Sequence, residues 1–180
     1  MIRDADNPVA RLRIITNTQK AADFLLERAH SIIGTDIDIE VLDGAMVFCP
    51  SQVPLPIQAD TLIAAAEARW PDQTKIHLPT ESDNSTSVEV FGEEPAPFLI
   101  DLFEGNMLIG VDGTPGQNVL VAAWLRSVMP EEAPRIIVTD DCLSTHAELP
   151  FGVTAEQVAA TMVDHGVPGW DADDPDWLQL

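Results

Sequence analysis

The sequence predicts an α+β fold, in which two tandem ββαββ modules form a largely antiparallel sheet with helices on one side. Two pairs of strand-like segments each enclose a Gly-containing turn, an Ala-rich helical segment follows each pair, and two further strand-like segments follow each helix. The second set of elements lies about 60 residues after the first. A true duplication explains this shift, and so does a generic order of hairpin, helix and hairpin, so both interpretations stay open.

Residues 1–35 are predicted to form an N-terminal strand and helix. Residues 11–15 alternate polar and apolar side chains, which is typical of a short strand. The helix begins at Asn17 or Thr18 and carries its apolar residues at helical spacing. Gly34 is suited to end it, because glycine readily adopts the left-handed conformation that follows a helix.

The first ββαββ module is predicted over residues 36–95. Its first strand alternates apolar and acidic residues, the pattern of a strand with one wet face, and Asp43 and Gly44 form the predicted turn. The helix ends in front of Pro71, because proline cannot continue a helix. The strands are predicted at residues 37–42, 47–48, 75–80 and 87–90.

The second module, with a C-terminal helix, is predicted over residues 96–166. Its hairpin consists of a strand over residues 98–103, a turn over 104–106 and a return strand over 107–111. Thr114 and Pro115 start the helix, since the hydroxyl can accept from a backbone N–H and proline needs no donor at the first helical position. This helix ends before Pro130.

Two strands and a last helix complete this module. The strands are predicted at residues 135–140 and 146–149. Thr154 and Gln157 have the spacing of a capping box, in which the two side chains satisfy each other's backbone N–H groups at a helix start. The helix is predicted to continue to Gly166.

Residues 167–180 combine two tryptophans with four aspartates and cannot continue that helix. Trp170 and Trp177 lie outside any apolar periodicity. They are expected either to dock on the protein's own core or to contact a partner, because tryptophan is enriched among the residues that dominate interfaces. Trp170 is expected to be the structural one and Trp177 the more exposed one.

Acidic residues dominate the composition, with 30 acidic and 9 basic residues and a formal net charge of −21. Residues 1–34 contain 5 basic and 4 acidic residues, so residues 35–180 contain 26 acidic and 4 basic residues, a net charge of −22. This field disfavours nucleic acid and anionic membranes as partners, because phosphate contacts need Lys and Arg. It favours a basic protein partner, although acidity is also a general solubility trait, and both explanations stay open.

A chain of 180 residues with 46% hydrophobic residues can bury a substantial core, most simply as one compact domain. The two cysteines are too few to staple such a fold, and no signal-peptide pattern opens the chain, so a cytoplasmic location is expected. The longest uncharged run, residues 44–59, contains three prolines and is too short to cross a bilayer. No membrane association is expected.

One cluster resembles a chemical site, and it consists of Asp140, Asp141, Cys142 and His146. Such residues can hold a metal ion or form a Cys–His pair. A nucleophilic thiol needs positive charge to lower its pKa, however, whereas Cys142 follows two carboxylates, so an ordinary hairpin loop is favoured. No phosphate loop, dinucleotide motif or zinc spacing is present. The expectation is therefore a non-catalytic protein without a cofactor.

In character the chain resembles the small acidic immunity proteins that bacteria encode beside secreted toxins. The resemblance rests on size, acidity, the absence of an active-site motif, cysteine usage and the aspartate-tryptophan segment 170–177. It implies a cytoplasmic inhibitor that occludes the basic cleft of a toxin. The partner-binding residues expected in the second module and the C-terminal segment are Asp140, Asp141, Trp170, Asp171, Asp173, Asp174, Asp176 and Trp177.

Two other classes of function stay open. An enzyme or metal-binding protein would use the loop that contains Asp140, Asp141, Cys142 and His146. An acidic mimic of nucleic acid would instead present a continuous stripe of carboxylates to a DNA-binding protein. A homodimer is compatible with each of these functions, and the sequence does not fix the oligomeric state.

Overall fold

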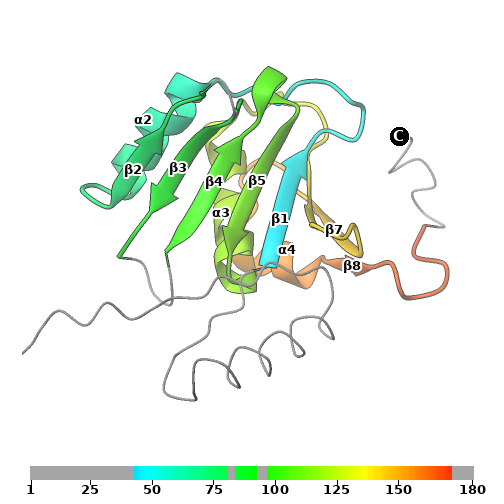
Figure 1. The fold of residues 1–180 in the computed structure, drawn as a ribbon. Helices are drawn as coiled ribbons and strands as arrows, with labels where there is room; N and C mark the ends of the chain where they lie inside the picture. Colours follow the sequence, from blue (N-terminus) through cyan, green and yellow to red (C-terminus); the bar gives the residue numbers. More distant parts are fainter. Residues whose placement is uncertain (1–42, 81–83, 93–96, 172–180) are drawn as a thin grey trace, which may run out of the picture. The chain divides into compact units, whose positions relative to one another are not determined.

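The computed structural model describes residues 43–80, 84–92 and 97–171, and the fold is given for these residues (Figure 1). They form an eight-stranded antiparallel sheet with three α-helices, which confirms the predicted α+β class. The elements are β1 (Asp43–Phe48), α2 (Ala59–Arg69), β2 (Thr74–His77), β3 (Thr86–Val90), β4 (Phe98–Leu102), the 3-10 turn η1 (Glu104–Asn106), β5 (Leu108–Gly113), α3 (Pro115–Val128), β6 (Ile137–Asp140), β7 (Thr145–Glu148), α4 (Ala155–Ala160) and β8 (Val163–Asp164).

Helices α2 and α3 lie behind the sheet in the view of Figure 1 and pack on one of its faces. In β4, every second residue from Phe98 to Leu102 is buried and the residues between them are partly exposed, as expected for a strand with a single core-facing side. Trp70, which follows α2, contacts both the sheet and α3. Its ring makes edge contacts with Phe98 at 5.4 Å and with Trp124 of α3 at 4.8 Å between ring centroids.

Strand β1 connects the two predicted modules within one sheet. The strand order is β2-β3-β4-β5-β1-β6-β7-β8, so β1 lies between β5 and β6, the two strands that α3 connects. The predicted β4–β5 hairpin is confirmed, and its turn contains Gly105 (φ 75°) and Asn106 (φ 57°) in left-handed conformations. A strand of the first module therefore lies inside the second module rather than beside it.

The predicted turn at Asp43 and Gly44 is wrong, because both residues belong to β1, opposite Gly113 and Asp112 of β5. Gly44 serves close packing instead. A Cβ atom at this position would lie 3.1 Å from the Cβ atom of Asp141, which is shorter than an ordinary contact. The glycine thus allows the β6–β7 turn to approach β1.

The predicted capping box at Thr154 is present, and the predicted start of α3 at Thr114 and Pro115 also has a capping box. In α3, Thr114 Oγ1 accepts from the Gln117 N–H at 3.4 Å, and Gln117 Oε1 accepts from the Thr114 N–H at 2.9 Å. In α4, the corresponding distances between Thr154 and Gln157 are 3.2 Å and 2.9 Å. These local hydrogen bonds explain why both helices begin where the sequence places them.

The predicted end of the last helix is wrong, because α4 ends at Ala160 instead of Gly166. The Thr161 hydroxyl and the Thr161 N–H both donate to the Gln157 carbonyl, at 2.9 Å and 3.0 Å, and such a hydroxyl bond tends to bend the end of a helix. Val163 then enters β8 and pairs with His146 of β7. No helix of the described residues is long and apolar enough to cross a membrane.

Candidate functional site at the β6–β7 turn

The carboxylate of Asp140 organises the turn between β6 and β7. Its Oδ1 accepts hydrogen bonds from the backbone N–H groups of Ser144 at 2.6 Å and Thr145 at 3.1 Å, and its Oδ2 accepts one from the Ser144 hydroxyl. These bonds hold the turn while Leu143 adopts a left-handed conformation, with φ 54°. Asp140 therefore shapes the surface as well as contributing charge to it.

Asp141 and Cys142 lie at the exposed tip of this turn. The Asp141 N–H donates to the Gly44 carbonyl at 3.0 Å, which fixes the tip against β1. The Cys142 thiol donates to Asp141 Oδ1 at 3.1 Å, an arrangement that disfavours the thiolate needed for nucleophilic chemistry. Among the described residues, no group of three or more His, Cys, Asp or Glu side chains is placed to hold a metal ion.

A pair of histidines joins this turn to the segment after α4. His165 Nδ1 lies 2.6 Å from the Leu143 carbonyl oxygen, which can only accept, so Nδ1 carries a proton. His165 Nε2 lies 2.7 Å from Nδ1 of His146 on β7. In the neutral pair, His146 is therefore the donor and His165 the acceptor. The His165 backbone N–H also donates to the Ser144 carbonyl at 2.9 Å, so the turn holds His165 at two points.

Trp170 covers the histidine pair. Its ring stacks on His165, with 3.8 Å between the ring centroids and 21° between the planes. The same ring meets His146 edge-on at 6.0 Å. Trp170 is partly buried and so packs on the protein's own fold, in contact with the segment that holds the turn.

An open pocket of about 710 Å³ lies beside the histidine pair. Its charged residues are Arg135 and Glu148, whose Nε and Oε1 atoms form an ion pair at 2.7 Å. His146 and Trp170 contribute aromatic surface, and the other lining residues are Pro150, Thr161 and Val163. This pocket lies along β7 and β8, at the edge of the sheet.

Four of the eight predicted partner-binding residues lie within the described residues. Asp140 and Asp141 form the turn, and Trp170 is connected to the turn through His165. Asp171 follows Trp170 and is exposed. The other four, Asp173, Asp174, Asp176 and Trp177, lie outside the described residues.

The four basic residues of segment 35–180 are all described, and one of them is inside the core. The Arg126 side chain belongs to α3, and the residue is only 3% exposed. Its guanidinium donates to the backbone carbonyls of Leu149 at 2.9 Å, Pro130 at 2.9 Å and Glu131 at 3.0 Å. Arg126 thus satisfies these carbonyl groups and connects α3 to the residues that follow α3 and β7.

The other three basic residues are engaged at the surface. Lys75 pairs with Glu89 at 3.7 Å, and Arg135 pairs with Glu148 at 2.7 Å. The guanidinium of Arg69 lies 5.8 Å from the ring centre of the tryptophan that follows it. None of these three contacts involves a carboxylate of the β6–β7 turn.

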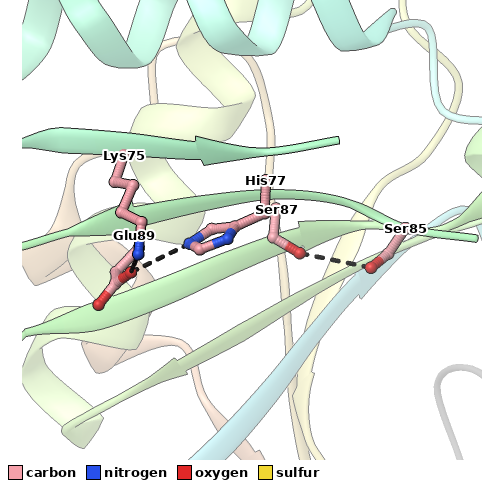
Figure 2. Close-up of polar contacts among 5 residues, drawn as sticks. All are labelled: Lys75, His77, Ser85, Ser87 and Glu89. Carbon is pink, nitrogen blue, oxygen red and sulfur yellow. Dashed lines mark hydrogen bonds and ion pairs between the residues drawn. The ribbon is translucent and has the colours of Figure 1, made fainter. Parts of the chain in front are cut away.

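A second polar cluster lies on β2 and β3 (Figure 2). His77 Nε2 is 3.0 Å from Glu89 Oε2, and the Lys75 ammonium reaches the same oxygen. The buried hydroxyls of Ser85 and Ser87 are 3.3 Å apart on β3 and the residue before it. Because Glu89 has two basic neighbours, this cluster adds little uncompensated negative charge to the surface.

The sequence pattern alone does not reveal the contact between His146 and His165. The two residues are 19 positions apart and meet because β8, a strand of only two residues, pairs with β7. A strand this short has no detectable periodicity, and the spacing of Val158, Met162 and Val163 is that of one helix face. No local signal could have located the histidine pair.

Comparison of the chain with protein-family models, with curated proteins and with solved structures found no match.

Proposed function

We propose that this protein is a non-catalytic module that binds and inhibits a basic protein, in the manner of an immunity protein that occludes the cleft of a toxin. The proposal rests on one observation, which is that the few basic residues of the acidic segment already have partners within the fold. Segment 35–180 has 26 acidic and 4 basic residues, and each of the 4 basic residues already has a partner within the fold. Segment 35–180 therefore keeps a large excess of carboxylates over basic groups, and a basic partner can pair with them.

The contact surface that we propose is centred on the β6–β7 turn and Trp170. Asp141 on the turn, Asp164 on β8 and Asp171 after Trp170 are exposed, and the Trp170 ring stacks on His165. An aromatic centre with a charged rim is the arrangement that strong protein interfaces commonly use. Because a stable interface buries roughly 1,600 Å² in total, the partner would also cover the neighbouring pocket along β7 and β8.

The experiment that tests this function is recovery of the protein from the cells that make it, at about 50 mM and about 500 mM salt. The expected result is one basic protein bound in equal amount at low salt and released at high salt, because salt screens charge pairs beyond a few ångströms. The recovered protein should lose its own activity on addition of one equivalent of this chain. Recovery of no basic protein at low salt would contradict the proposal.

Stoichiometry separates specific from nonspecific binding in the same experiment. A polyanion without a defined surface captures many basic proteins in variable amounts, whereas an inhibitor captures one in a fixed ratio. Capture of a mixture without a dominant 1:1 complex would therefore also contradict the proposed function.

A further inference from the structure

We infer that the His146–His165 pair is a proton-controlled latch, which holds Trp170 on the β6–β7 turn when at most one imidazole is charged and releases it when both are charged. The latch denotes these two histidines together with Trp170. Its consequence for partner binding rests on the proposed function, because Trp170 lies at the centre of the proposed contact surface. The latch itself is a property of the protein alone and can be tested without a partner.

Proton counting sets the behaviour of the pair. The nitrogen atoms of His146 and His165 that face each other are 2.7 Å apart, so one proton at most can lie between them. A first added proton fits on the other nitrogen of His146, because Nδ1 of that ring still donates to His165. A second added proton would place N–H groups on both facing nitrogens. Two donors cannot share this bond, so the rings must separate.

Separation of the two histidine rings also changes the contacts of Trp170 and of the β6–β7 turn. Trp170 stacks on His165, and His165 is held by the carbonyls of Leu143 and Ser144. If His165 moves away from His146, the stacked indole loses its edge contact with His146 and the support of a fixed platform. A charged imidazole can still attract an indole face, so Trp170 is expected to move together with His165 and to be released from its place beside His146.

Titratable and charged groups lie on the elements next to the latch. They are Asp140, Asp141 and Cys142 on the turn, Arg135 and Glu148 in the neighbouring pocket, Asp164 on β8, and Asp171 after the indole. Most of these groups are carboxylates, which supply compensating charge when the histidines gain protons.

The test follows the indole N–H resonances of the four tryptophans by NMR as the pH falls from 8 to 5 and beyond, until both imidazoles show charged chemical shifts. Trp170→Phe identifies the Trp170 signal, and the position of this signal in the wild-type protein at pH 8 marks the held state. The expected result is a shift of the Trp170 signal away from that position as the second imidazole charges. Trp70 and Trp124 report the core, and their signals should stay in place.

His146→Asn provides the matched variant, because its amide occupies the place of Nδ1 and can either donate to His165 or accept from it. In this variant the Trp170 signal should keep its pH 8 position in acid. His77→Gln removes a histidine on β2 and should leave the wild-type transition unchanged.

Three outcomes would overturn the latch. The first is an unmoved Trp170 signal in the wild-type protein when both imidazoles are charged. The second is the same acid-induced shift in His146→Asn as in the wild type. The third is loss of the Trp70 and Trp124 signals before Trp170 moves, which would mean that the pair opens only when the whole fold opens. None of these outcomes depends on a partner, so failure of the latch is distinguishable from failure of the proposed function.

Discussion

Arg126 is buried in the core of an otherwise acidic protein. Backbone carbonyls of the segments after α3 and β7 accept hydrogen bonds from its N–H groups. Replacing it by methionine keeps much of the side-chain volume but leaves these buried carbonyls without their charged donor. We expect Arg126→Met to lower the free energy of unfolding by about 3 kcal/mol. Urea unfolding measures this loss. Arg69→Met, at an exposed position, should change it by less than about 0.5 kcal/mol, and equal losses would contradict the role of Arg126.

The two cysteines should differ in reactivity, because Cys49 is buried and Cys142 is exposed. Burial raises the pKa of the Cys49 thiol, so its reactive thiolate is disfavoured in the folded protein. At pH 8, Ellman's reagent should modify one thiol quickly and the second about 100-fold more slowly, until the protein is unfolded. The fast phase should vanish in Cys142→Ser. A fast phase of two thiols in the native protein would contradict the assigned burial.

The same thiol has a defined effect on stability. Since the pKa of Cys49 is raised by folding, its contribution to stability is present below the ordinary pKa of a thiol and is lost as the pH rises through the raised value. This effect therefore concerns alkaline pH and is separate from the acid range of the histidine latch.

Among the elements, those with local signals could be predicted from the sequence and those defined by tertiary pairing could not. The β4–β5 hairpin and the starts of α3 and α4 follow from a glycine turn, a Thr-Pro pair and a capping box, which act within a few residues. The place of β1 between β5 and β6 depends on pairing with strands 60 or more residues away along the chain. The sequence around Asp43 and Gly44 does not indicate that these residues belong to a strand and not to a turn.

Gly44 offers a test of how β1 meets the candidate site. A methyl group at this position would lie 3.1 Å from the Asp141 Cβ atom, so we expect Gly44→Ala to displace the turn and cost about 1 to 2 kcal/mol. Gly116 in α3 is the control, because a Cβ atom there would have no neighbour within 4 Å. Gly116→Ala should stabilise the protein by about 0.5 to 1 kcal/mol. Thermal unfolding compares both variants, and equal effects would contradict the close approach at Gly44.

At the scale of the whole molecule, the sequence predicts the charge but not its placement. The excess of acidic residues is visible in the composition, and four of the expected partner-binding residues gather at or next to the β6–β7 turn. The role of Asp140 in shaping that turn, and the histidine pair that supports Trp170, depend on hydrogen bonds between segments far apart in the chain. These contacts carry no signature in a single sequence.

The most direct test of the acidic contact surface compares two variants of equal charge against the basic protein recovered with this chain. One variant replaces Asp141 and Asp171 by asparagine, and the other replaces Asp60 and Asp72, which are exposed on α2 and the turn after it. At about 50 mM salt, calorimetry should show binding at least about 10-fold weaker for the first variant and less than about 3-fold weaker for the second.

The difference between the variants should shrink at about 500 mM salt, because the carboxylates act through screened charge. Equal loss of affinity in both variants would show that only the overall charge matters. That result would contradict the claim that the β6–β7 turn and Trp170 form the contact surface.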